Sequence, residues 1–99
     1  MPTFVMLIKS SPEFVKNLKS IDEMAKKTGA AYRAACPEVN VTTHLALLGP
    51  YDFMDIVEAP SEESAFKMAA AILSSGMVSS IETWTALHYA KFAEIMKSI

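Results

Sequence analysis

Two strand-forming stretches, residues 39–48 and 53–59, lie in the centre of the sequence on either side of a short turn. Gly49 and Pro50 are typical turn residues, and the two polar residues that follow them complete a four-residue loop. Pro60 ends the second stretch. A β-hairpin at this point constrains the fold more than any other feature, because its turn determines which residues pair across the two strands.

A four-residue loop places Leu48 opposite Phe53 and therefore predicts every other pair in the hairpin. In this register His44 lies opposite Val57 and is diagonal to Asp55. The distance between diagonal neighbours is within the reach of long side chains, so the hairpin is expected to bring an imidazole near a carboxylate.

Alternation along the hairpin predicts two faces of different character. One face is almost wholly apolar and is expected to be covered by helices. The other is mixed and is expected to lie open to a partner or a cavity. The apolar face comprises Thr43, Leu45, Leu47, Met54 and Ile56, and the mixed face comprises Thr42, His44, Ala46, Leu48, Phe53, Asp55 and Val57.

The remaining periodicities add two strands and a set of helices to the hairpin. They predict a strand at 3–9, a short helix near 12–19, a main helix at about 21–35, a helix between Ser61 and Gly76, a strand at 78–86 and a C-terminal helix at 88–99. Two right-handed crossovers then place both main helices on one face of a four-stranded antiparallel sheet of order 4-1-3-2. This α+β fold is the ferredoxin-like βαββαβ arrangement with a tail helix, and its other sheet face is bare in a monomer.

The size and composition of the chain exclude several classes of function. Ninety-nine residues predict one domain, 1–99, and a hydrophobic content of 52% suggests a second buried surface, which favours a homodimer or higher oligomer. The net charge of −2, with no basic run beyond Lys26-Lys27, argues against nucleic-acid binding. The longest apolar run, 68–73, is too short to cross a membrane. The single cysteine, Cys36, cannot form an internal disulfide, so cytoplasmic residence is expected.

Four segments together resemble the GYD-domain family over nearly the whole chain. They are residues 1–5, 47–52, 58–60 and 82–84, and the namesake residues of the family correspond to Gly49, Tyr51 and Asp52, with Pro50 interposed. The resemblance implies a ferredoxin-like subunit of a dimeric α/β barrel, in which two sheets pack bare face to bare face. Related barrel families include cofactor-free monooxygenases, haem-degrading enzymes and amino-acid-sensing domains, but a shared fold alone transfers none of these activities.

His44 and Asp55 are the candidate catalytic residues. A carboxylate in an apolar strand at an interface between subunits needs a partner, solvent in a cavity or a proton. Three interpretations stay open: a satisfied polar pair at a dimer interface, part of a ligand cavity, or a general base in which Asp55 orients the imidazole.

Further candidates for ligand contact come from the hairpin and the last strand. Tyr51 and Asp52 either contact a substrate at the mouth of the sheet or serve only the turn. If Ile81 faces the helices, Glu82 and Trp84 join the open face, where Trp84 is either a cavity wall or a dimer anchor. The expected ligand-binding set is therefore His44, Tyr51, Asp52, Phe53, Asp55, Glu82 and Trp84.

No metal ligand spacing and no phosphate-binding loop is present, so neither a metal nor a cofactor is predicted. The favoured function is binding of a small organic ligand in a cavity on the open sheet face of an oligomer. The alternatives are a cofactor-free monooxygenase or isomerase that uses the His–Asp pair, and an assembly module that binds no ligand.

Overall fold

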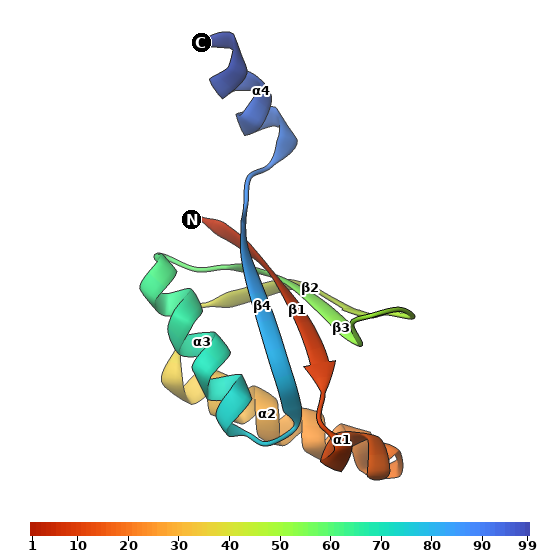
Figure 1. Ribbon diagram of the computed structural model, residues 1–99. Helices are drawn as coiled ribbons and strands as arrows, with labels where there is room; N and C mark the ends of the chain where they lie inside the picture. Colours follow the sequence, from red (N-terminus) through yellow and green to blue (C-terminus); the bar gives the residue numbers. More distant parts are fainter.

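The computed structural model describes residues 1–99 as a four-stranded sheet with helices on one side and a detached C-terminal helix (Figure 1). In chain order the elements are β1 (Thr3–Ser10), α1 (Pro12–Lys16), the 3-10 turn η1 (Leu18–Ser20), α2 (Ile21–Ala35), β2 (Asn40–Ala46), β3 (Phe53–Glu58), α3 (Glu62–Ser74), β4 (Val78–Ala86) and α4 (Tyr89–Lys97). None of these helices is long and apolar enough to cross a bilayer.

Serine caps begin two of the helices. The Ser11 side chain accepts a hydrogen bond from the Phe14 amide, and that of Ser61 accepts one from the Ser64 amide. Ser20 makes no such bond, so the capping box that the sequence suggests there does not form. The predicted helix near 12–19 is instead a short α-helix followed by the tighter turn η1, which leads directly into α2.

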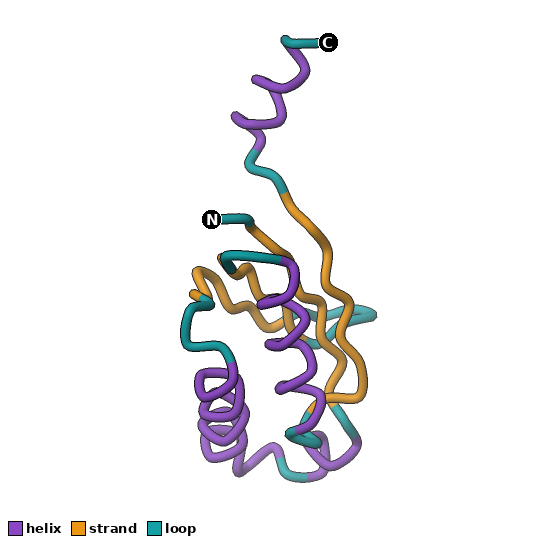
Figure 2. Tube along the Cα trace, turned by 90° about the vertical axis from the view of Figure 1, so that its left-hand side faces the viewer, coloured by secondary structure: helices purple, strands orange, loops and turns teal.

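The predicted topology is confirmed. The strands lie in the order β2-β3-β1-β4, and all neighbours are antiparallel. Both views show α2 and α3 side by side on one face of this sheet (Figures 1 and 2). The fold is therefore a ferredoxin-like α+β sheet with its helices on one side.

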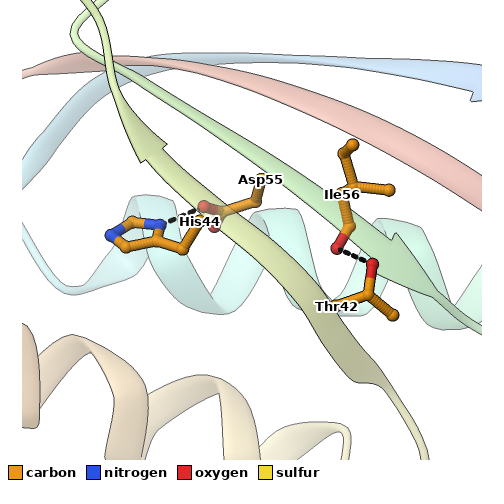
Figure 3. Close-up of polar contacts among 4 residues, drawn as sticks. All are labelled: Thr42, His44, Asp55 and Ile56. Carbon is orange, nitrogen blue, oxygen red and sulfur yellow. Dashed lines mark hydrogen bonds and ion pairs between the residues drawn. The ribbon is translucent and has the colours of Figure 1, made fainter.

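The predicted hairpin register is wrong by two residues. Ala46, and not Leu48, pairs with Phe53, so His44 lies directly opposite Asp55. The connection between the strands is longer than a four-residue turn because its end is tied to β1: the Asp52 amide donates to the Ile8 carbonyl at 2.8 Å. Nearer the start of β2 the pairing is irregular, and the Thr42 hydroxyl donates to the Ile56 carbonyl across it (Figure 3).

The assignment of the two hairpin faces is also wrong. Val57 is fully buried in the core with Phe4 and Met6 of β1 and with Met68 and Ile72 of α3. The mixed face therefore lies against the helices. Phe53 and Asp55 lie on the same side as Val57 because side chains alternate along β3. His44, which pairs with Asp55, lies on this side too.

The side without helices is consequently the apolar one. Its central row crosses three strands in register, with Ile56 opposite Val5 and Val5 opposite Trp84. A second row joins Leu45, Met54, Leu7 and Glu82. We call this side the open face. α4 does not cover it, because the helix extends beyond the end of the sheet (Figure 1), and the Cα radius of gyration, 14.8 Å, exceeds the ~13 Å of a compact chain of this length.

Candidate functional site

A pocket of about 490 Å³ opens between the helix-covered side of the sheet and helices α1 and α2. Most of the residues that line it are hydrophobic. They include Ile8 of β1, Phe14 of α1, Tyr32 of α2, Val41 of β2 and Val78 of β4. Helix α1 and the turn η1 connect β1 to α2, and Phe14 and Ile21 line the pocket at the two ends of this connection.

His44 and Asp55 line this pocket from the hairpin. Their side chains contact each other between β2 and β3 (Figure 3). The His44 Nδ1 contacts the Asp55 Oδ1, and because an ionised carboxylate only accepts, Nδ1 is the donor in that state. The Asp55 side chain is 9% exposed, whereas that of His44 is 63% exposed. Asp55 is therefore buried, and His44 is its hydrogen-bond partner. Solvent or a ligand can still reach the Nε2 of His44.

One aromatic ring packs against the imidazole, and a second ring packs against the first. His44 stacks on Phe53 with 5.6 Å between ring centroids and an interplanar angle of 11°. Phe14 meets the same Phe53 ring edge-on at 5.8 Å. These contacts restrict the rotation of the imidazole and give the pocket an aromatic surface beside its one hydrogen-bonding pair.

Sequence reasoning did not identify Arg33 as a site residue. Its guanidinium lies over the Tyr32 ring, 5.6 Å from the centroid, and it also lines the pocket. A Cβ at Gly29 would lie 2.9 Å from the Arg33 Nη1. The absence of a side chain at Gly29 therefore provides the space that the guanidinium occupies. The signal in the sequence was the spacing of four residues between Gly29 and Arg33, which places both on one side of α2.

Tyr51, Glu82 and Trp84 form a separate cluster on the other side of the sheet. The Tyr51 hydroxyl donates to the Glu82 carboxylate, and the Trp84 Nε1 donates to the same group at 3.3 Å. The Lys9 ammonium lies 5.6 Å from the centre of the Tyr51 ring. Because Ile81 is packed against the core, Glu82 and Trp84 lie on the open face. The sequence predicts this side for them, but it also predicts that His44 and Asp55 share it, and those two residues lie on the other side of the sheet.

The hydrogen bond to Glu82 raises the pKa of the Tyr51 phenol above its ordinary value of 10.0, and burial and the Glu82 charge act in the same direction. We expect Glu82→Ala to lower this pKa, so that Tyr51 ionises at a lower pH. The measurement is an alkaline titration of phenolate absorbance, with Tyr51→Phe identifying the signal and Glu58→Ala as the control. An unchanged titration in Glu82→Ala would contradict the contact.

The structure thus divides the predicted ligand-binding set among three places. His44, Phe53 and Asp55 lie in the pocket, whereas Tyr51 belongs to the cluster beside the open face with Glu82 and Trp84. Asp52 serves the turn: its carboxylate accepts a 2.8 Å hydrogen bond from the Ser10 amide. Nowhere do three His, Cys, Asp or Glu side chains gather closely enough to hold a metal ion.

Cys36 is buried in the core and has no part in either cluster. Its thiol donates to the Ser64 carbonyl at 3.7 Å. Burial raises the pKa of the Cys36 thiol, and the nearby Glu38 carboxylate raises it further. A thiol in such surroundings stays protonated, so Cys36 packs like a small hydrophobic residue.

Comparison with known proteins places this geometry in context. The family model described as GYD domain matches residues 4–96. A protein of Thermus thermophilus named "Glutamine synthetase and cystathionine beta-lyase binding protein" is 34% identical over 89 residues, which are 86% of this chain and 85% of that protein.

Solved structures share the fold. The crystal structure of TTHA0845 from Thermus thermophilus superposes with a TM-score of 0.58 at 25% identity, over 89% of this chain and 95% of that one. The 5-chloro-2-hydroxyhydroquinone dehydrochlorinase of Burkholderia phenoliruptrix, in complex with 2,5-dihydroxybenzoquinone, gives a TM-score of 0.50 at 14% identity, over 87% and 94% of the two chains. At that identity the second likeness concerns the fold alone.

Proposed function

This chain belongs to the GYD-domain family, and we propose that it binds a small organic ligand in the pocket between its sheet and helices α1 and α2. The observation that carries the proposal is the His44–Asp55 pair in the wall of a largely apolar pocket. The ligand is expected on the helix-covered side and not on the open face, because His44 and Asp55 lie on the helix-covered side.

The dimensions and chemistry of the pocket suit such a ligand. A volume of about 490 Å³ lies within the range of roughly 300–1,000 Å³ that small-molecule sites occupy. Such sites combine an apolar lining with a few polar groups that orient the ligand. Here the exposed side of His44 and the Arg33 guanidinium supply the polar groups. Phe14, Phe53 and Tyr32 supply flat apolar surface. The ligand class that fits is a planar, mainly apolar molecule with one group that hydrogen-bonds to an imidazole.

A tryptophan introduced into the pocket wall tests this proposal. Ala25 lines the pocket from α2, so Ala25→Trp should fill part of it and weaken ligand binding at least ~10-fold. Ala34, on the same helix, is exposed and does not line the pocket, so Ala34→Trp is the matched control.

Native mass spectrometry of freshly purified protein first identifies any ligand that co-purifies. Thermal-shift screening of planar organic compounds then ranks the candidates, and titration of the best compound gives its dissociation constant for each variant. Equal affinity in the wild type and in Ala25→Trp would reject this pocket as the site. Equal loss in both tryptophan variants would reject it as well.

The orientation of His44 favours a second candidate, a cofactor-free enzyme of the isomerase or oxygenase type. An ionised Asp55 carboxylate accepts from Nδ1, and in that state Nε2 is the nitrogen that can accept a proton from a bound substrate. Incubation of the best-binding compound with wild-type protein, followed by mass analysis, separates this candidate from simple binding. A catalyst converts the compound, and His44→Ala then loses turnover more than affinity; a binding protein returns the compound unchanged.

The relative in Thermus thermophilus favours a third candidate, a module that binds other proteins. The exposed apolar surface on the open face supports it, since monomers rarely leave a large apolar patch uncovered. Sedimentation of this protein with purified glutamine synthetase, and separately with cystathionine β-lyase, is the direct test. Co-sedimentation that Ala25→Trp leaves intact would assign partner binding to a surface other than the pocket.

The same surface leads us to propose a homodimer, or a higher oligomer built from dimers, in which two open faces pack together. The central row of Ile56, Val5 and Trp84 runs across three strands, and Trp84 is 52% exposed in the single subunit. Burial of such a row removes apolar area from water on both copies at once. With one buried, reduced cysteine, the chain suits the cytoplasm.

A further inference from the structure

Helix α4 carries an apolar side that its own subunit leaves uncovered. Tyr89, Phe92, Ile95 and Met96 recur at helical spacing, and all four are exposed. Tyr89 and Phe92 contact each other, with ring centroids 6.1 Å apart. A helix of nine residues is shorter than the roughly 12–15 residues that isolated helices need to be even marginally stable in water. α4 therefore requires a surface to pack against.

The chain that precedes α4 directs it away from its own domain. Ala86, the last residue of β4, is paired with Thr3 of β1. His88 follows, and its Nε2 lies 3.3 Å from the Thr3 hydroxyl. These contacts hold the link between β4 and α4 against the start of β1, and both views show the helix extending beyond the end of the sheet (Figures 1 and 2).

A second apolar feature of the subunit lies between a helix and the edge of the sheet. A groove of about 610 Å³ runs between α3 and β4, the edge strand of the sheet. Apolar side chains dominate its lining, and Phe66, on its wall, is 78% exposed. Its lining residues are Phe4, Ala65, Phe66, Ala69, Leu73 and Ile81, among others, and none of them belongs to the ligand pocket.

The helix and the groove match in length and in charge. At 1.5 Å per residue, α4 is about 14 Å long and α3 about 20 Å, so the helix fits alongside α3. Glu62 and Glu63 give the first turn of α3 two negative charges. α4 contributes Lys91 and Lys97 against the single acidic residue Glu94. The helix thus carries excess positive charge, whereas one end of the groove is negative, and these charges are complementary.

We propose that α4 of one subunit docks into the α3–β4 groove of a second copy of this chain. Each chain contains both the helix and the groove. In a two-fold dimer every subunit therefore contributes one α4 helix to its partner and accepts one in its own groove. The exchange covers the apolar side of α4 and the exposed Phe66 together. It is independent of the proposed ligand site, because the groove and the pocket share no residue.

Disulfide trapping between two different single-cysteine variants tests the exchange. Met96→Cys places a thiol on the apolar side of α4, and Phe66→Cys or Leu73→Cys places one on the groove wall. The native Cys36 is buried and contributes no exposed thiol. After the Met96 variant is mixed with each groove variant and oxidised, we expect a mixed disulfide-linked dimer with at least one of them on a non-reducing gel. Glu94→Cys, on the opposite side of the helix, is the control and should give at most a tenth of that yield.

A second measurement does not depend on disulfide geometry. Phe92→Ser combined with Ile95→Ser changes only exposed side chains, so the sheet should fold normally by circular dichroism. We expect these substitutions, and separately Phe66→Ser, to raise the dissociation constant of the dimer at least ~10-fold. Equal trapping through Met96 and Glu94, no trapped mixed dimer, or an unchanged dissociation constant would each overturn the exchange.

Discussion

The substitution Ile56→Asp is expected to weaken the dimer and to raise its dissociation constant at least ~100-fold, which is about 2.7 kcal/mol. Ile56 lies in the middle of the open face, between Thr43 of β2 and Val5 of β1. In a face-to-face dimer, an aspartate at this position would be buried against apolar side chains of the second copy with no cation to pair with it. Sedimentation equilibrium over a range of protein concentrations gives the dissociation constant.

Leu48→Asp is the matched control for this experiment. Leu48 is a fully exposed apolar residue in the hairpin loop, so the same chemical change should alter neither fold nor assembly. Far-ultraviolet circular dichroism then shows whether each variant keeps its secondary structure. A folded Ile56→Asp variant that dimerises as tightly as the wild type would disprove packing through the open face, as would a wild-type protein that remains a monomer at high concentration.

The order of the strands and the placement of the helices on a single face were predictable, because they follow from local signals and from the handedness of crossovers. The hairpin register was not. A turn centred on Gly49 and Pro50 predicts a short loop, but the backbone and carboxylate of Asp52 bond to Ile8 and Ser10 of β1, more than forty residues earlier in the chain. Contacts between such distant segments leave no periodic signal in the sequence.

The two hairpin faces were separated correctly but assigned to the wrong sides. The assignment assumed that helices cover the more apolar side of the hairpin. This assumption is valid when helices pack against a sheet face along its whole length. Here α1 and α2 leave a pocket over one end of the hairpin, and that pocket accommodates the His44–Asp55 pair. The apolar residues on the other side, such as Met54 and Ile56, are left for a partner to cover. Only the placement of the helices in space distinguishes these two arrangements.

Only the part of the candidate site that lies within the hairpin could be predicted from the sequence. Spacing within one hairpin could bring His44 and Asp55 together, and the corrected register brings them closer than the diagonal position would. Phe14 and Arg33 come from helices whose approach to the sheet depends on tertiary packing, so no pattern in the hairpin could have indicated them. The proposed ligand site and the proposed dimer face consequently occupy opposite sides of one sheet, and substitutions on one side should leave the other unaffected.

The His44–Asp55 pair should show a strongly non-additive effect on stability. In His44→Ala the buried Asp55 carboxylate loses its only side-chain partner, which costs about 1–3 kcal/mol when no other group replaces it. Because the His44 side chain is 63% exposed, water replaces part of the contact, so we expect the lower half of that range, about 1–2 kcal/mol. In the double variant His44→Ala with Asp55→Leu, no carboxylate remains to be satisfied, and most of this loss should be recovered.

Urea unfolding of the wild type, the two single variants and the double variant gives the coupling free energy, which we expect to be about 1 kcal/mol. All four proteins must be compared at one concentration, because dimerisation contributes to the apparent stability. Thr42→Val is the matched control: it removes an exposed hydrogen bond from the same strand and should cost below ~0.5 kcal/mol. A His44→Ala variant as stable as the wild type would mean that water alone satisfies Asp55. A double variant whose loss equals the sum of the two single losses would mean that the pair contributes nothing as a pair, and His44 would then be held in the pocket by its stacking on Phe53 alone.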